Sequence, residues 1–119
     1  MNYVPLPQRT KSFALRVIKA CVFLDEGSSS LLRTLSKQLL RSGTSVGANC
    51  RESIGAQSHR DYIHKLEISL KECHETQYWL ELLIESDLVE IERFQPLLEE
   101  AIEIGKILTT VTRKLKAKS

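Results

Sequence analysis

Apolar residues recur at alternating spacings of three and four along the chain, a rhythm that matches one face of an α-helix. The pattern predicts four helices, over residues 11–24, over residues 31–53, from Ser58 to Ile84 and from about Ile91 to Leu115. No stretch of the sequence alternates in the manner of a β-strand. Four amphipathic helices with short connections predict an all-α protein, an antiparallel up-down-up-down four-helix bundle.

The bundle is expected to be a single domain over residues 1–119, because a chain of this length has room for one core. Residues 1–10 are predicted to form an extended N-terminal arm, and Thr10 is predicted to cap the first helix. Residues 116–119 are predicted to form a basic tail.

Capping residues also mark the other helix starts. Serines at positions 28–30 offer caps for the second helix. Ser58, followed three residues later by Asp61, resembles a capping box that opens the third helix. Pro96 is compatible with the fourth helix only if it lies in the first turn.

Each predicted helix has one inner face. In the first helix we expect Ala14, Val17, Cys21 and Leu24 to face inward, with Ile18 beside them. The inner residues expected in the other helices are Leu32, Leu35, Leu39, Ser42, Val46, Cys50 and Ser53, then Tyr62, Leu66, Ser69, Cys73, Gln77, Leu80 and Ile84, then Phe94, Leu98, Ala101, Gly105, Leu108, Thr112 and Leu115.

Small residues fill the second half of the second helix, from Ser42 to Ala48. Gly43 and Gly47 each cost about 1 kcal/mol relative to alanine inside a helix. Residues of this kind either let another backbone approach closely or mark a bend. We expect one long helix, and two shorter helices are the alternative.

Composition places the chain among ordinary globular proteins, with 42% hydrophobic and 27% charged residues. No run is long and apolar enough for a membrane span, and the N-terminal sequence lacks the pattern of a signal peptide. We therefore expect a cytoplasmic protein. Cys21, Cys50 and Cys73 form no CxxC pair and no zinc-binding spacing, so they are expected to be reduced, buried thiols.

Charge is segregated along the chain. Residues 1–60 carry a net charge of +6, residues 61–105 a net charge of −9 and residues 106–119 a net charge of +5. The third predicted helix also carries opposite charges four residues apart, which favours ion pairs along its own surface. Segregated charge favours electrostatically steered binding, either to another molecule or between subunits.

Three segments of the sequence resemble a known family. They are residues 39–53, residues 61–66 and residues 75–83. The chain resembles the bacterial four-helix-bundle family that includes proteins encoded in intervening sequences of large-subunit ribosomal RNA genes. The accessory variability determinant of diversity-generating retroelements is a relative of this family. The resemblance implies a pentameric ring of four-helix protomers, a basic surface suspected of binding nucleic acid and, in the retroelement branch, a reverse transcriptase partner.

A row of cations lies on the outer face of the second predicted helix. When the helix is wound with Leu39 inward, four basic side chains fall within about 80° of one another over about 27 Å. We name these residues the basic stripe: Arg33, Lys37, Arg41 and Arg51. The basic stripe could bind RNA or DNA phosphates, and it could equally be a solvated face or pair with acidic helices of a neighbouring subunit.

Arg16 and Lys19 of the first helix add two outward cations to the candidate nucleic-acid site. The C-terminal cations are less informative, because a helix C-terminus favours positive charge in any case.

A second apolar surface is predicted on the side of the third helix opposite its inner face. Ile68, Trp79 and Leu82 lie there, and Phe23 behaves in the same way on the first helix. An uncovered tryptophan on a monomer is unusual, so these four residues are a candidate oligomer interface. The alternative is that a loop or the N-terminal arm covers Trp79.

The sequence contains no recognisable catalytic or cofactor-binding pattern. His59, His64 and His74 do not share a helix face, and no Glu-x-x-His pair of the di-iron type is present. We expect no catalytic residues, no metal and no cofactor. The leading hypothesis is a non-catalytic oligomer that binds nucleic acid, and the alternative is a protein-protein scaffold or accessory subunit.

Overall fold

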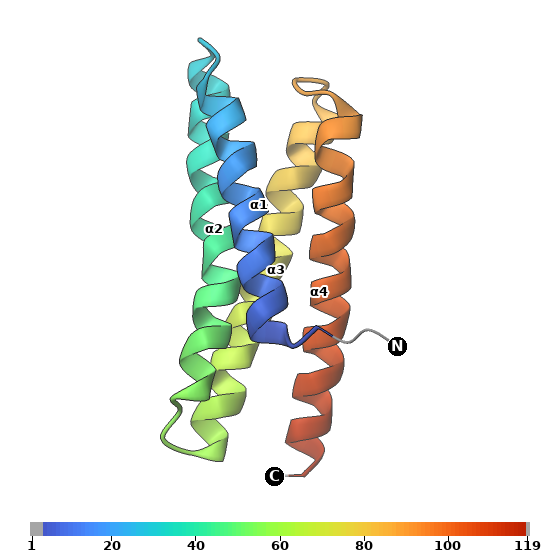
Figure 1. The fold of residues 1–119 in the computed structure, drawn as a ribbon. Helices are drawn as coiled ribbons and strands as arrows, with labels where there is room; N and C mark the ends of the chain where they lie inside the picture. Colours follow the sequence, from blue (N-terminus) through green and yellow to red (C-terminus); the bar gives the residue numbers. More distant parts are fainter. Residues whose placement is uncertain (1–3, 119) are drawn as a thin grey trace.

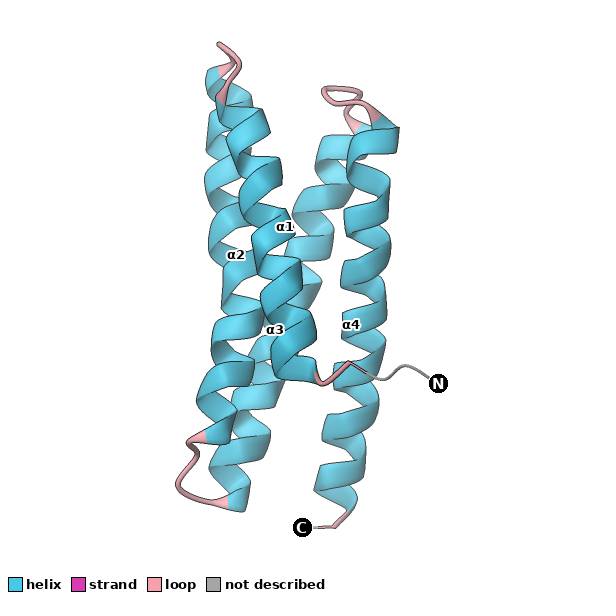
Figure 2. Cartoon of the chain, in the orientation of Figure 1, coloured by secondary structure: helices cyan, strands magenta, loops and turns pink. Residues whose placement is uncertain are grey.

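The computed structural model describes residues 4–118 and contains four α-helices in this range. They are α1 (Leu6–Asp25), α2 (Ser30–Ile54), α3 (His59–Glu85) and α4 (Ile91–Ala117). Successive helices run in opposite directions and are joined by short turns (Figure 1). The described residues form no strand (Figure 2). The predicted antiparallel four-helix bundle is therefore confirmed.

Most of the predicted inner residues form the core. Those that are only half-buried are Ala14, Leu32, Leu35, Tyr62, Gln77 and Leu115. Leu39, Cys73, Leu80 and Leu108 are fully buried, as their helical spacing predicts. On α1, however, the buried residues include Phe13, whereas Ile18 is 41% exposed. The prediction for Ile18 was wrong because α1 is rotated to bury the aromatic ring of Phe13, which removes more apolar surface from water.

The glycines of α2 allow α1 to approach closely. A Cβ atom added to Gly43 would lie 2.8 Å from a methyl carbon of Val17, and one added to Gly47 would lie 3.1 Å from the backbone oxygen of Thr10. The helix is continuous across both glycines. The expectation of one long helix is confirmed, and the glycines serve close packing instead of a bend.

The predicted N-terminal arm is wrong where it covers residues 6–10, because α1 already begins at Leu6. Pro7 lies in the first turn, where its missing N–H costs nothing. Thr10 is buried inside the helix and donates its hydroxyl hydrogen bond to the Leu6 carbonyl at 2.7 Å, so it does not cap the helix. Residues 1–3 of the predicted arm lie outside the described residues.

Two expectations for α4 were also wrong. Pro96 is the sixth residue of the helix and not in the first turn. It is tolerated because Pro96 and Glu92 are both exposed, so water can reach the Glu92 carbonyl that a Pro96 N–H would otherwise contact. The predicted basic tail is helical as far as Ala117, and Lys116 forms an ion pair with Glu67. Ser119 lies outside the described residues.

The helix caps agree with the sequence at two starts. Ser29 accepts a hydrogen bond from the Leu32 N–H at 3.2 Å, and Ser58 accepts one from the Asp61 N–H at 3.0 Å. The Asp61 carboxylate accepts from the Gln57 N–H in return, one residue earlier than in a capping box. These caps satisfy N–H groups that a helix start otherwise leaves without partners.

The ion pairs of α3 join it to other helices, whereas along α3 Asp61 acts on Lys65 only as a weaker electrostatic attraction. Lys65 binds Glu52 of α2 at 2.9 Å, and Arg41 of α2 binds both Glu72 and Glu75. Interhelical pairs form because α2 and α3 pack side by side over most of their length (Figure 1).

The contact between α1 and α4 is looser than the contact between α1 and α2. Arg9 of α1 donates two hydrogen bonds of 2.8 Å to the Glu100 carboxylate of α4. Further along, the ring of Phe23 lies 6.3 Å from the ring of buried Phe94. We name this boundary the α1–α4 seam.

None of the four helices is long and apolar enough to cross a membrane.

The close contact at Gly43 gives a test of the packing. Alanine gains about 1 kcal/mol in helix propensity, but overpacking against Val17 costs about 1–3 kcal/mol. We expect Gly43→Ala to lower the free energy of unfolding by about 1 kcal/mol in urea denaturation followed by circular dichroism. Gly55→Ala is the matched control, because its added Cβ would meet nothing closer than 3.9 Å. A Gly43→Ala protein as stable as the parent would contradict the packing argument.

The Arg9–Glu100 pair predicts a dependence of stability on pH. Hydrogen bonding to Arg9 lowers the pKa of Glu100. A carboxyl with a lowered folded pKa adds stability above its ordinary pKa of about 4.3, and that stability is lost as the pH falls through the folded value. The stability difference between the parent and Glu100→Gln should therefore shrink between about pH 5 and pH 3.

The stability difference between the parent and Arg9→Gln should shrink over the same pH range. The double variant should show no further loss of stability relative to either single variant. If the free energies of unfolding of the parent and Glu100→Gln differ by a constant amount across this pH range, the Arg9–Glu100 pair does not make stability depend on pH.

Candidate nucleic-acid interface

Two of the four basic-stripe residues are engaged within the protein. Arg41 donates to Glu72 at 3.2 Å and also pairs with Glu75. Arg33 donates to the backbone oxygen of Gly27 at 3.0 Å, in the turn before α2. The acidic partners of Arg41 are more than 30 residues away in sequence, so helical periodicity could not reveal them. The basic stripe is therefore weaker as a ligand surface than its sequence indicates.

The other two stripe residues face different surroundings. Lys37 is exposed, and it makes no ion pair with any described residue. Arg51 lies in a groove of about 410 Å³ between α1 and α2, together with Lys11. The sequence analysis did not select Lys11, because its position relative to α2 depends on how α1 packs.

Arg16 and Lys19 lie together at the α1–α4 seam, away from the basic stripe. They line a hollow of about 240 Å³ with Arg93 of α4. We name this hollow the seam groove. Its lining residues are Arg16, Lys19, Ala20, Phe23, Arg93 and Leu97.

The seam groove is cationic. None of Arg16, Lys19 and Arg93 forms an ion pair within residues 4–118, and no acidic residue lines the groove. The neighbouring seam carboxylate, Glu100, is held by Arg9. Arg16 also attracts Glu100 and helps to lower the pKa of that carboxyl, although the two form no ion pair. Three cations that form no ion pair among the described residues can attract an anion.

Arg93 was not among the residues predicted for the candidate site. It lies in the acidic segment of the chain, beside Phe94, which was correctly expected to face inward. A residue that precedes an inward one lies about 100° around the helix, at the flank of the buried face. That signal places Arg93 at an edge of the bundle, but it does not show which helix lies across that edge.

The candidate oligomer-interface residues are covered to different extents. Trp79 is half-buried against the core of its own chain, and its Nε1 donates to Glu75 at 3.0 Å. The expectation of an uncovered Trp79 was wrong, because the ring packs at the margin of the core. Phe23 is 42% and Leu82 37% exposed, and Ile68 is partly buried. Their role in an interface stays a prediction.

An apolar surface that the sequence analysis did not find lies along α1. Leu15, Ile18 and Val22 are 53%, 41% and 56% exposed. Their spacings of three and four place them on one side of the helix. We name them the α1 ridge. It was missed because Ile18 had been assigned to the inner face.

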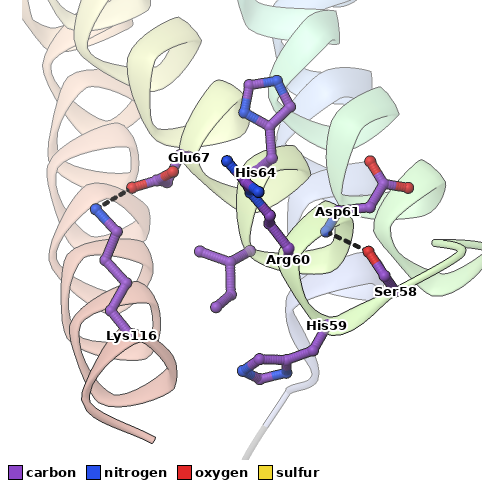
Figure 3. Close-up of a pocket in the computed structure, with 8 residues that line it drawn as sticks. Ser58, His59, Arg60, Asp61, His64, Glu67 and Lys116 are labelled. Carbon is purple, nitrogen blue, oxygen red and sulfur yellow. Dashed lines mark hydrogen bonds and ion pairs between the residues drawn. The ribbon is translucent and has the colours of Figure 1, made fainter. Parts of the chain in front are cut away.

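A hollow of about 880 Å³ lies near the start of α3 and the end of α4 (Figure 3). The hollow is open because α1 starts some way short of this end of the bundle, and the other three helices extend past it (Figure 1). Its lining residues are Ser58, His59, Arg60, Asp61, Ile63, His64, Glu67 and Lys116.

The charged groups of this hollow are partly paired with one another. Lys116 binds Glu67 (Figure 3), and His59 Nε2 lies 3.4 Å from the Leu115 carbonyl oxygen. His74 lines a separate groove further along α3. Within the described part of the chain, no three His, Cys, Asp or Glu side chains are grouped to hold a metal ion.

The three cysteines are buried and form no disulfide, as expected. Burial raises the pKa of each thiol, and it raises that of Cys73 to about 11. The thiols are therefore protonated near neutral pH, and a protonated thiol is a poor nucleophile.

Comparisons with known proteins agree with this geometry. The family model of the 23S rRNA-intervening sequence proteins matches residues 6–110, from the start of α1 through most of α4. A crystal structure of a protein with unknown function, from the S23 ribosomal protein family of Bacteroides thetaiotaomicron VPI-5482, is 41% identical in sequence. The match covers 91% of this chain and 98% of that chain, with a TM-score of 0.83.

No curated protein matches the chain. The family match spans the helices that form the core and both sides of the seam groove. The sequence resemblance, the four-helix architecture and the two comparisons agree, and the chain belongs to the family of 23S rRNA-intervening sequence proteins.

Proposed function

We propose that this chain is a non-catalytic protein that binds nucleic acid through phosphate contacts at the seam groove. The observation that carries the proposal is the meeting of Arg16, Lys19 and Arg93 in one hollow, where the described residues supply no acidic lining and no ion pair to these three. Phosphate oxygens are the anions for which arginine and lysine are best suited.

The charge distribution supports this proposal. The first two helices carry eight Lys and Arg against two Asp and Glu, whereas α3 carries three against six. The first two helices thus carry a net charge of +6, which the net charge of −3 on α3 offsets only in part. Lys37 and Arg51 of the basic stripe form no ion pair within residues 4–118, and they can add to the attraction of a polyanion.

The cations favour phosphate contacts over sequence reading. Among the described residues, the groove lining includes no Asn or Gln, the side chains that pair with adenine edges. Phosphate contacts are independent of sequence and weaken strongly as salt displaces them. The expected ligand is therefore RNA or DNA of no fixed sequence.

The proposal predicts a steep dependence of binding on salt. Three phosphate contacts should give a slope of about −2 to −3 for the logarithm of affinity against the logarithm of salt concentration. Fluorescence anisotropy with a labelled RNA hairpin and with duplex DNA measures this slope. We expect the triple variant Arg16→Gln, Lys19→Gln and Arg93→Gln to reduce the slope to near that of a neutral surface.

The matched control is the triple variant Lys106→Gln, Arg113→Gln and Lys114→Gln, which removes the same charge from exposed positions on α4. It should retain most of the parent affinity. If both triple variants lose affinity equally, binding reflects net charge and not the groove. A parent protein that binds neither ligand at low salt contradicts the proposal.

A second candidate function, self-association as a scaffold or accessory subunit, is favoured by the α1 ridge. Three neighbouring apolar side chains, each more than 40% exposed, favour a protein contact. A ring of identical protomers, as the family resemblance implies, would cover this surface. The expectation of five protomers rests on that resemblance alone. In this function a basic face of one protomer could pair with acidic residues of the next.

Light scattering tests self-association. We expect the parent at micromolar concentration to have a mass well above the 13.6 kDa of one chain. Changing Leu15, Ile18 and Val22 together to Gln removes the ridge without adding charge and should shift the mass toward that of a monomer.

The control changes Leu31, Leu88 and Ile91 to Gln, because these side chains are similarly exposed but lie outside α1. It should leave the assembly intact. A monomeric parent would sink the idea of self-association, and a ridge variant that stays assembled would place the interface elsewhere, at Leu82 and Ile68 for instance.

A further inference from the structure

The seam groove contains an aromatic side chain among its cations. The ring of Phe23 is 42% exposed, and the guanidinium carbon of Arg93 lies 3.9 Å from the ring centre. Phosphate binding does not need such a stack. A planar guanidinium over an aromatic ring is, however, a surface on which a nucleobase can stack.

Buried Phe94 supports the Phe23–Arg93 stack. The ring of Phe23 packs against Phe94 at 6.3 Å between centroids, and Phe94 is fully buried. Phe94 comes from α4 and Phe23 from α1, so both helices fix the stack. A fixed planar surface loses little conformational freedom when a base binds to it.

The groove also contains cations placed beside the stack. Arg16 and Lys19 line the same hollow as Phe23 and Arg93. The spacing of three between Arg16 and Lys19, and of four between Lys19 and Phe23, puts these α1 side chains along one side of the helix. Alternating cations and aromatic groups are the arrangement that binds single strands.

From these contacts we infer that the seam groove binds a single-stranded nucleic acid, with one base stacked on the Phe23–Arg93 pair and the flanking phosphates held by Arg16 and Lys19. This inference rests on the proposed function and names its ligand. Duplex bases are stacked on one another, so they cannot reach the pair without unstacking.

The size and chemistry of the hollow agree with one base of a continuous strand. At about 240 Å³ it is smaller than the 300–1,000 Å³ typical of sites that enclose a whole small molecule. Among the described residues, no neutral hydroxyl or amide side chain lines it, so the sugar 2′-hydroxyl has no neutral partner there. We therefore expect RNA and DNA strands to bind alike.

The test compares labelled 12-nucleotide single strands of RNA and DNA with a duplex of the same sequence, by fluorescence anisotropy at low salt. We expect the parent to bind single strands more tightly than duplex. Phe23→Leu keeps an apolar side chain on Phe94 but removes the ring, and it should lower single-strand affinity about tenfold while leaving duplex affinity unchanged.

Arg93→Lys is the second variant, because it keeps the charge and removes the planar group. It should lower the ratio of single-strand to duplex affinity in the same direction. Tyr78→Leu is the matched control, since Tyr78 is an aromatic residue of α3 that is 53% exposed and does not line the groove. It should change neither affinity.

The outcomes separate this inference from the proposed function. If the parent binds duplex and single strands equally, and Phe23→Leu and Arg93→Lys bind as the parent does, phosphate binding stands and base stacking is wrong. If the parent binds no nucleic acid at low salt, both are wrong. A strong preference for single-stranded RNA over single-stranded DNA would contradict the expectation that binding does not depend on the sugar.

Discussion

The packing of α1 against the glycines of α2 determines where the first helix lies, and the two sides of α1 differ as a result. Gly43 and Gly47 have no side chain, so Val17 and Thr10 of α1 pack directly against the backbone of α2. This contact holds α1 tightly to α2. On its other side α1 meets α4 more loosely, through the Arg9–Glu100 pair and the Phe23–Phe94 contact. The seam groove lies at this looser boundary.

Polar groups inside the bundle are satisfied, so the unpaired cations stand out. Ser69 donates to the Val46 carbonyl at 2.7 Å, and Thr76 donates to Ser42 at 3.0 Å, which joins α2 to α3 inside the core. Among the described residues, no buried side-chain nitrogen or oxygen lacks a hydrogen-bond partner. The acids of α3 likewise hold Arg41 and Lys65. The seam-groove cations Arg16, Lys19 and Arg93 are among those that form no ion pair within residues 4–118.

The candidate site was predictable in part. Arg16 and Lys19 were selected from the sequence, and the structure places them in one groove. Arg41 was selected for the same reason, yet it is bound by Glu72 and Glu75. A helical wheel shows which side chains of one helix share a face. It gives no account of the acids that a neighbouring helix brings to that face.

The sequence by itself determined the four helices, their antiparallel order and most of the core, because these follow from local periodicity, capping and short connections. The tertiary structure decided the rotation of α1, which buried Phe13 and exposed Ile18, and it decided which cations remain unpaired. It also brought Arg93 of an acidic segment beside Phe23, 70 residues earlier in the chain. Such contacts depend on how helices pack against one another, and the spacing of residues within one helix carries no information about its neighbour's orientation.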